Sequence, residues 1–317
     1  MDAAVAGSSD AAATAERERP TVTLVGLGHM GAAIAERLLD AGYQLRVFNR
    51  TAGRDAELVE RGATRIDSAD AALVAADVCI TSLADDAAVE AVLLGDDGVL
   101  AHASGESTLV DTSTISVAAS RRVGDAADSA GVAYLRAPLS GNPTAIRNGK
   151  AAVIVSGPED TVRGLEPLLT AIAPAFRYVG DGEDARVLKL VLQILIGGTA
   201  GILAEAVALG EAAGIERRTV LEVIGASVVG SAFVEYKSEP LLRDDYSATF
   251  TTAMMAKDAD LIRALAAEVG TDVPLTDELR SLLDEACERG HADEDFMSLL
   301  LLLRERAAEA DPEREKR

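Results

Sequence analysis

A glycine-spaced turn between a strand pattern and a helix pattern constrains this chain more than any other feature. Residues 21–25 (TVTLV) have the β-branched and apolar character of a buried strand. Gly26, Gly28 and Gly31 follow at the spacing G-x-G-x-x-G and lead into apolar residues that recur at helical spacing. A second strand-like run, residues 44–48, comes next. This order of strand, turn, helix and strand indicates a dinucleotide-binding βαβ unit.

Each glycine in the turn has a separate physical role. We expect Gly26 to permit the tight turn after the strand, Gly28 to let a pyrophosphate approach the backbone, and Gly31 to let the helix pack closely on the strand. Free N–H groups at the start of the helix would then face the phosphates. The alternative is a glycine-rich turn that binds nothing, and the correct flanks on both sides argue against it. The predicted cofactor contacts in this turn are Gly26, Leu27, Gly28, His29, Met30 and Gly31.

Composition excludes several classes of function. The formal net charge of −22 argues against binding a nucleic-acid backbone, and the absence of tryptophan argues against base stacking. The two cysteines, Cys79 and Cys287, lie far apart, so we expect free thiols in a reducing, cytoplasmic compartment. The histidines and cysteines show no metal-site spacing, and we expect no metal. The N-terminus lacks the apolar run of a signal peptide.

The chain has room for two domains of ordinary size. We expect a disordered tail at residues 1–19, an α/β Rossmann-type doubly wound domain at 20–182, an all-helical domain at 183–309 and a charged tail at 310–317. The first domain is expected to have a mainly parallel sheet with helices on both faces. Its ligands would lie at the carboxyl ends of the strands.

The pattern of apolar residues also predicts individual elements. Strands are expected at residues 21–25, 44–48, 63–66, 78–82, 108–111, 132–136, 151–156 and 176–179, and helices near 30–41, 53–61, 68–75, 85–94, 116–130 and 159–171. The second domain is expected to begin with one long helix, 183–214, followed by helices near 216–229, 231–243, 252–269, 275–290 and 293–309. The longest apolar stretch lies inside the long helix and carries Lys189, Gln193 and Glu205. We therefore expect a buried helix rather than a membrane span.

The end of the second strand indicates which dinucleotide is bound. In NAD enzymes this strand usually ends in an acidic residue that holds the ribose hydroxyls. Here it ends in Asn49, Arg50 and Thr51, which remove the negative charge and offer hydrogen-bond donors to a 2′-phosphate. We therefore expect NADP(H) in preference to NAD(H). The alternative for Arg50 is an ordinary surface arginine.

Lys189 is the strongest candidate for catalysis. Burial in so apolar a helix would lower the pKa of its amine toward the working pH, which suits a general acid/base. Gln193 lies one turn further on the same face and could hold the substrate oxygen or fix the lysine. On residue chemistry alone, a lysine that extends to solvent at the helix edge is an equal alternative.

Three other segments are weaker candidates by themselves. Residues 111–114 (DTST) and 138–142 (PLSGN) follow strands and offer hydroxyl and N–H groups that could hold a carboxylate, although ordinary caps or turns use the same residues. Lys257 and Asp258 lie inside a predicted helix, and the simpler interpretation is that they lie on its solvent-exposed face.

Taken in order, these segments resemble the β-hydroxyacid dehydrogenase family, from about residue 21 to residue 303. The matching motifs are G-L-G-x-M-G at 26–31, D-x-S-T at 111–114, A-P-x-S-G at 137–141, the lysine sixteen residues before Glu205-Ala206, K-D at 257–258 and D-F at 295–296. Several ordered motifs together are more specific than any one of them.

The resemblance implies a role for each matching residue. Lys189 would protonate the carbonyl oxygen during reduction and remove the hydroxyl proton during oxidation, while hydride passes to or from the nicotinamide. The substrate carboxylate would be held by Ser113, Ser140 and Gly141, with Asn142 beside them. The residues implied near the nicotinamide end of the cofactor are Leu83, Ala84, Thr114 and Lys257.

The chain departs from the family pattern around the substrate. The family's Asn one turn after the lysine is Gln193, the second glycine of S-G-G is Asn142, and the proline of an L-P pair is Ala84. The reaction class is therefore better supported than the substrate.

We expect an NADP-dependent oxidoreductase of short β-hydroxy acids or their aldehydo or keto partners. Two alternatives remain open: an NADPH-dependent imine reductase, which Lys189 argues against because those enzymes usually lack that lysine, and a non-catalytic dinucleotide-binding protein. The strongly apolar helical domain favours a homodimer or homotetramer, as in the family.

Overall fold

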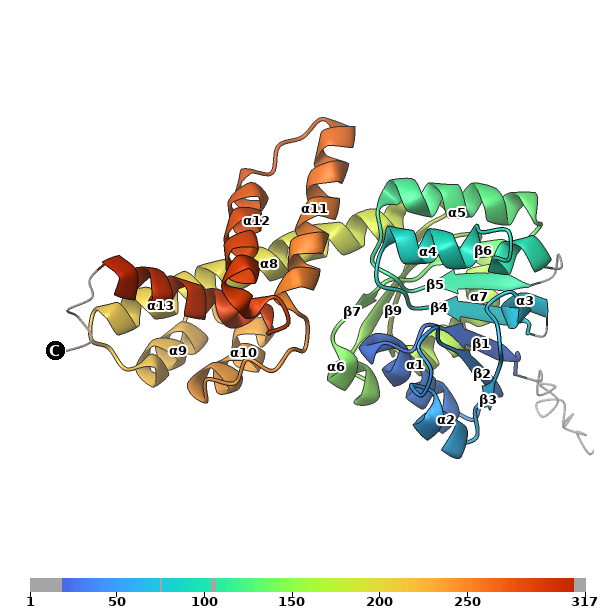
Figure 1. Cartoon of the computed structure of the whole chain (residues 1–317), viewed down its shortest axis with the longest axis horizontal. Coiled ribbons are helices and arrows are strands. Elements are labelled where there is room, and N and C mark those ends of the chain that lie inside the picture. Colours follow the sequence, from blue (N-terminus) through green and yellow to red (C-terminus); the bar gives the residue numbers. More distant parts are fainter. Residues whose placement is uncertain (1–18, 75, 104–106, 311–317) are drawn as a thin grey trace, which may run out of the picture.

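The computed structural model describes residues 19–74, 76–103 and 107–310, which form two domains joined by one long helix (Figure 1). The expected tails lie outside the described residues, apart from one residue of each. Arg19 donates a hydrogen bond to the carbonyl of Ala41 and lies over the ring of Tyr43. Ala310 ends the last helix.

The sheet of the first domain confirms the doubly wound prediction. Its strand order is β3-β2-β1-β4-β5-β6-β8-β7, with β9 paired to β8. The strands are β1 (Val22–Val25), β2 (Leu45–Phe48), β3 (Thr64–Arg65), β4 (Val78–Thr81), β5 (Thr108–Asp111), β6 (Ala133–Arg136), β7 (Leu139–Ser140), β8 (Ala152–Ser156) and β9 (Ala175–Gly180). From β3 to β6 the strands are parallel, in the order typical of a dinucleotide-binding fold.

The far half of the sheet contains a reversal that the sequence pattern did not reveal. β8 runs antiparallel to β6 and to the unpredicted strand β7. Between β6 and β8 the chain makes only β7 and the five-residue helix α6 (Pro143–Arg147), which the pattern also missed. A parallel return needs a longer crossover, so this short connection brings the chain back antiparallel.

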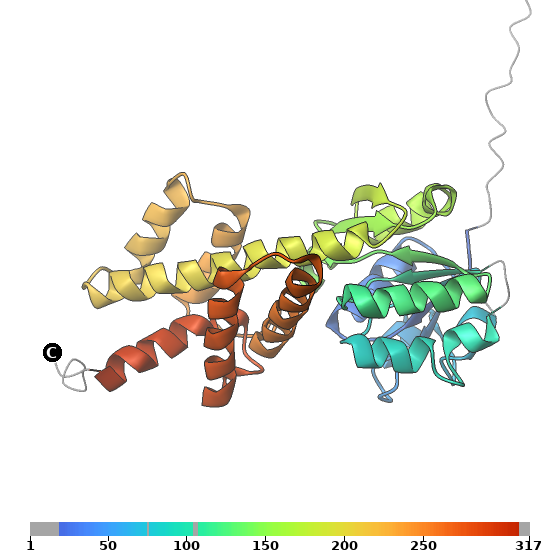
Figure 2. The same ribbon diagram turned by 90° about the horizontal axis from the view of Figure 1, so that it is seen from above.

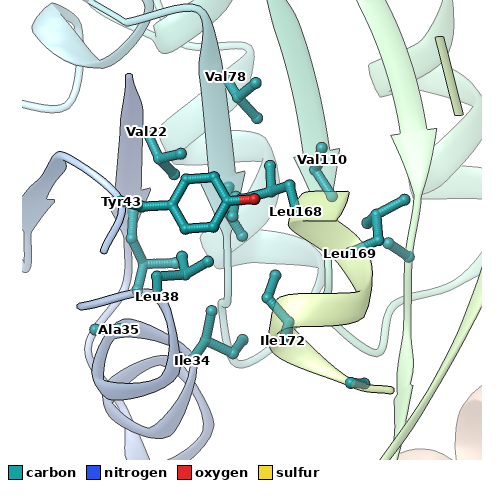
Figure 3. Close-up of a cluster of buried hydrophobic side chains, with 14 of the residues drawn as sticks. Val22, Ile34, Ala35, Leu38, Tyr43, Val78, Val110, Leu168, Leu169 and Ile172 are labelled. Carbon is teal, nitrogen blue, oxygen red and sulfur yellow. The ribbon is translucent and has the colours of Figure 1, made fainter. Parts of the chain in front are cut away.

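Helices cover both faces of the sheet, and alternate strand residues supply the two cores. Ile80 of β4 belongs to one core and its neighbour Cys79 to the other, as the two-residue period of a strand requires. Figure 3 shows the first core, where Ile34 and Leu38 pack with Leu168 and Tyr43. The helices of this domain are α1 (His29–Asp40), α2 (Ala56–Glu60), α3 (Ala71–Val74), α4 (Asp86–Leu93), the 3-10 turn Val99–His102, α5 (Val117–Ser129), α6 and α7 (Glu159–Ile172).

The second domain is helical, as expected, and is organised along α8 (Asp184–Ala212). Figure 2 shows α8 leaving the sheet domain with α9 and α10 on one side and α11 to α13 on the other. Gly197 permits close packing, because an added Cβ would lie 2.7 Å from a methyl carbon of Leu279. The remaining helices are α9 (Arg217–Ala226), α10 (Ala232–Leu242), α11 (Thr252–Val269), α12 (Pro274–Ala286) with a π turn at Cys287–His291, a 3-10 turn at Phe296–Ser298, and α13 (Leu299–Ala310).

Two helices in this domain are interrupted where the prediction continued them, and α9 ends at Ala226 rather than at residue 229. The helix expected at 275–290 ends at Ala286, and Gly290 has a φ of 101° in the turn that follows. The helix expected at 293–309 begins only at Leu299, because Asp295 caps a separate 3-10 turn before it, its side chain accepting from the N–H of Met297. Hydrophobic periodicity continues across both breaks, so it could not locate them.

Among the described residues, α8 alone is long and apolar enough to cross a membrane by length and composition. Core helices pass the same test. Three polar residues on α8, Arg186, Lys189 and Gln193, are buried against other parts of the protein.

The first turn of α8 is anchored to the sheet by buried charges. Arg186, which is 1 % exposed, forms an ion pair with the fully buried Asp111 at the end of β5 and also donates to the carbonyl of Ser113. Beside it, Arg136 at the end of β6 pairs with Glu183 over 2.6 Å. The helix therefore leaves the sheet in a fixed orientation.

Replacing Arg186 with Met should lower the free energy of unfolding by about 3 kcal/mol or more, because the carboxylate of Asp111 would remain buried without its partner. Urea unfolding measures this. The matched control is Arg163→Met on α7, where the ion pair with Glu159 is exposed and should contribute little. Equal losses in the two variants would contradict the anchoring role.

Candidate active site

The glycine turn has the geometry of a phosphate cradle. Gly26 has a φ of 98°, and an added Cβ would lie 2.3 Å from the carbonyl oxygen of Ser82. A Cβ on Gly31 would lie 1.9 Å from the carbonyl oxygen of Gly26. Gly28 differs, because its φ is −67° and an added Cβ would meet no atom within 4 Å. Neither backbone conformation nor protein packing requires a glycine at Gly28, and the open space there fits a ligand.

The helix start beside the cradle suits an anion. Gly28 is the N-cap of α1 and makes no side-chain capping bond, so no capping side chain satisfies the first N–H groups of the helix. His29 is exposed there and Met30 is half-buried. Leu27 lies differently, because it is buried and its N–H donates to Oδ1 of Asn49 over 2.9 Å.

Asn49 therefore has a structural task that the sequence did not reveal. Its Oδ1 accepts from Leu27, and its Nδ2 donates to the carbonyl of Thr51 over 2.9 Å. One end of the amide thus holds the glycine turn, and the other fixes the loop after β2 that carries Asn49 itself. Arg50 and Thr51 are exposed on that loop, at the carboxyl end of β2. Of the three predicted residues here, Arg50 and Thr51 have side chains that are free to contact a ligand phosphate, since Asn49 bonds only to the backbone of Thr51.

Lys189 is buried and held by two acceptors. It is 8 % exposed, and its Nζ donates to the carbonyl of Leu139 over 3.0 Å and to Oε1 of Gln193 over 3.3 Å. Burial lowers the pKa of the amine, the charge of Asp258 opposes that shift, and the charge of Lys257 adds to it. Lys189 is therefore not the solvent-extended lysine that the sequence left open.

A chain of polar contacts continues from Gln193 into α11. Nε2 of Gln193 donates to Oδ2 of Asp258, and Oδ1 of Asp258 lies 3.0 Å from Nζ of Lys257. Lys257 also donates to the carbonyl of Thr114 over 2.7 Å. The lysine predicted for catalysis and the lysine predicted for the cofactor are thus connected through two side chains. Lys257–Asp258 is not the solvated face that the sequence allowed.

Ser113 is buried in a network around Asp111. Its hydroxyl donates to Oδ1 of Asp111 over 2.6 Å and accepts from the N–H of Leu83 over 2.9 Å. The hydroxyl thus positions the loop that carries Leu83 and the exposed Ala84. Leu83 in turn lies beside the cradle, since its Cδ2 is 3.0 Å from the Cβ position of Gly26.

The loop after β7 reaches the helical domain through Asn142. Asn142 caps α6, because its Oδ1 accepts from the N–H of Ala145 over 2.8 Å, and its Nδ2 donates to the hydroxyl of Tyr236 on α10 over 2.7 Å. Both polar ends of this side chain are engaged by the protein. Ser140 is half-buried and Gly141 has a φ of 138°, which explains the glycine. The sequence singled out neither Tyr236 nor Arg186, and neither lies in a motif that could have indicated it.

A series of contacts connects many of the predicted residues at the carboxyl ends of the strands, although Arg50, Thr51, Ser140 and Asn142 are not part of it. The cradle adjoins Leu83, Leu83 bonds to Ser113, and the neighbouring Thr114 bonds to Lys257. From Lys257 the contacts lead through Asp258 and Gln193 to Lys189. Among the residues that the structure describes, no group of three or more His, Cys, Asp or Glu side chains could hold a metal ion.

Both domains match models of known protein families. Residues 21–180 match the NAD binding domain of 6-phosphogluconate dehydrogenase, and residues 183–303 match the NAD-binding domain described for NADP-dependent 3-hydroxyisobutyrate dehydrogenase. The first domain is thus a nicotinamide-dinucleotide-binding domain.

Two Pseudomonas aeruginosa proteins are each 33% identical to this chain. One is an NAD-dependent L-serine dehydrogenase, aligned over 87% of this chain and 95% of the relative. The other is a 3-hydroxyisobutyrate dehydrogenase, aligned over 89% and 98%.

Solved structures show the same arrangement. A crystal structure of 3-hydroxyisobutyrate dehydrogenase from Salmonella typhimurium is 26% identical and superposes with a TM-score of 0.81 over 89% of this chain and 99% of the other. An imine reductase from Pseudomonas sp. is 23% identical with a TM-score of 0.61 over 90% and 99%, and shares the fold. The matched family models, the length of the alignments and the ordered motifs agree: the chain belongs to the β-hydroxyacid dehydrogenase family of nicotinamide-dependent oxidoreductases.

Proposed function

We propose that this protein is an NADP-dependent oxidoreductase that transfers a hydride between nicotinamide and a short β-hydroxy acid or its aldehydo or keto partner, with Lys189 as general acid/base. The observation that carries the proposal is the buried Lys189 amine, held by two acceptors in the wall of the site. When bound, the cofactor supplies or accepts the hydride.

The geometry of Lys189 suits proton transfer in both directions. A lysine ammonium has three N–H donors. The carbonyl of Leu139 and Oε1 of Gln193 engage two of them, which leaves the third for a substrate oxygen. After that proton is transferred, the two remaining N–H groups can keep the same acceptors while the lone pair faces the substrate. The amine therefore does not need to reorient between donating and accepting a proton.

Gln193 is proposed to fix the lysine rather than to bind the substrate through its side chain. Its Oε1 accepts from Lys189 and its Nε2 donates to Asp258, so both ends of the amide are engaged. The longer side chain at this family position still supplies the acceptor that the lysine needs.

The substrate carboxylate is proposed to lie against residues 140–142. Among the described residues the hydroxyl of Ser140 has no hydrogen-bond partner, and the φ of Gly141 turns the backbone at this point. Asn142 and Ser113 are proposed to shape the site rather than to bind the carboxylate through their side chains, because these side chains already bond to Tyr236 and Asp111. Thr114 and Lys257 are proposed to face the nicotinamide end of the cofactor, together with Leu83 and Ala84.

Replacing Lys189 with Ala should lower kcat for a β-hydroxy acid by about 100-fold or more, since general acid/base catalysis typically contributes that much. NADPH binding should persist, because the cradle of Gly26, Gly28 and Gly31 is untouched. Steady-state kinetics and a cofactor fluorescence titration measure the two effects. The exposed Lys150 provides a matched control as Lys150→Ala, and a similar loss in both variants would contradict the assignment.

The preference for NADP(H) is proposed from the loop after β2. Asn49 stands where an acidic residue would repel a 2′-phosphate, and its bonds to Leu27 and Thr51 hold Arg50 at the sheet edge. Because one relative at 33% identity is NAD-dependent, the affinities for NADPH and NADH are compared directly.

Replacing Arg50 with Ala should weaken NADPH binding by about tenfold or more, the usual effect of losing a charge-assisted hydrogen bond. NADH lacks the 2′-phosphate, so its affinity should change little and serves as the internal control. Equilibrium titrations of both cofactors test this. An equal loss for the two would mean that Arg50 does not contact that phosphate.

One panel of substrates distinguishes the proposed function from its two alternatives, imine reduction and cofactor binding without catalysis. Glyoxylate, succinic semialdehyde, methylmalonate semialdehyde and cyclic imines are offered with NADPH to the wild type and to Lys189→Ala. Aldehyde reduction that requires Lys189 supports the proposed function. Imine turnover that survives the substitution supports an imine reductase, and tight NADPH binding without any turnover supports a binding protein.

The helical domain is proposed to form a homo-oligomer in the cytoplasm. Leu195, Ile202 and Leu209 are 63 %, 66 % and 72 % exposed and recur every seven residues along α8. A seven-residue apolar repeat forms a stripe that packs against another helix, and a second copy of α8 carries the same stripe. The free thiols of Cys79 and Cys287 fit a reducing compartment.

Light scattering should therefore give a molar mass at least twice the 32.9 kDa of the chain. Replacing Ile202 with Glu should shift the species toward the monomer, because a charge would enter the apolar contact. The control is Val269→Glu, an equally exposed apolar residue at the end of α11, away from the stripe. A monomeric wild type would overturn this proposal.

A further inference from the structure

Asp258 is the centre of the polar contacts that join the two lysines. Its side chain is about 1 % exposed, on the buried face of α11. One oxygen, Oδ2, accepts from Nε2 of Gln193, and the other, Oδ1, lies 3.0 Å from Nζ of Lys257. Oδ1 has no hydrogen-bond partner among the described residues. Its contact with Lys257 is therefore an ion pair without good hydrogen-bond alignment. Such a buried carboxylate needs these partners.

The chemistry of these groups determines which way the Gln193 amide faces. A carboxylate only accepts hydrogen bonds, so the amide nitrogen must face Asp258. The amide oxygen then faces Nζ of Lys189, which it accepts from over 3.3 Å. A flipped amide would place oxygen against the carboxylate and N–H groups against the lysine, and both contacts would be lost.

We propose that Asp258 is a positioning residue, which locks the Gln193 amide with its oxygen toward Lys189 and places one negative charge between the two lysines of the site. The proposal rests on the function proposed for Lys189. It assigns Asp258 a role apart from its neighbour Lys257, whose side chain reaches the carbonyl of Thr114.

The surrounding charges support this arrangement. From α11, the charge of Asp258 raises the pKa of Lys189 and the charge of Lys257 lowers it, while burial has the largest, lowering effect. On the same helix as Lys189, Arg186 is paired with Asp111 of β5. Asp258 is thus the negative group acting on Lys189, and its loss would favour the neutral amine.

The direct test uses Asp258→Asn, which keeps the shape of the side chain but removes its charge and lets either end of the new amide face Gln193. The chain has only five lysines, so lysine labelled with 13C at Cε gives few NMR signals, and Lys189→Ala assigns the one of interest. In Asp258→Asn the titration midpoint of Lys189 should fall by about one pH unit or more. This measurement does not depend on turnover.

The matched control is Asp260→Asn, which removes the same charge from an exposed position two residues away, where Asp260 pairs with Arg263 and Arg280. It should leave the Lys189 midpoint in place. A midpoint that is the same in Asp258→Asn as in Asp260→Asn would overturn the proposal, whatever the activity of the enzyme. Failure of the function proposed above would appear separately, as wild-type turnover that does not need Lys189.

Kinetics tests whether Asp258 acts through Gln193. Asp258→Asn should lower kcat by about tenfold with a smaller change in KM, and should have little further effect in a Gln193→Leu background. Equal losses in both backgrounds would overturn the positioning role. If Asp258→Asn does not fold, Gln193→Leu breaks the same link from its other end. It should then lower kcat by a similar factor, and an unchanged kcat would count against the proposal.

Discussion

The buried ion pair between Arg186 and Asp111 is the interaction on which the rest of the site depends. It joins the first turn of α8 to the carboxyl end of β5, and the same carboxylate holds the hydroxyl of Ser113. Lys189 lies three residues further along the same helix face. One buried pair therefore sets the position of the lysine relative to the loops beside the cofactor cradle. Neither of its charges can lose its partner without leaving the other unpaired inside the protein.

Much of the fold could be predicted because its signals are local. The glycine spacing, the alternation of strands and helices and the long apolar helix all lie in continuous segments, and β1, α1 and α8 formed where they indicated. The antiparallel β8 could not be predicted this way, since strand direction depends on the connection and on partners distant in sequence. The break before α13 depends likewise on Asp295, which pairs with the buried Lys237 of α10.

The same distinction between local signals and contacts distant in sequence applies to the site. Motifs identified the residues, but they did not show which atoms were free. Asn49 and Asn142 were predicted to contact ligands, and in the structure the amide of Asn49 bonds to the glycine turn while that of Asn142 caps α6 and bonds to Tyr236 of α10. From the sequence, Lys189 was equally compatible with a buried side chain and with one extended into solvent. Its burial and its contact with Leu139 decide between the two. These distinctions depend on contacts between segments far apart in the chain, which residue type and spacing do not determine.

If Lys189 exchanges a proton with the substrate oxygen, the two reaction directions must depend on pH in opposite ways. Oxidation needs the neutral amine and reduction needs the ammonium. Burial lowers the pKa of Lys189. We expect kcat/KM for oxidation to rise with pH and kcat/KM for reduction to fall, both through one group that titrates below the usual range of lysine. Profiles that change in the same direction, or a limb that persists unchanged in Lys189→Ala, would contradict it.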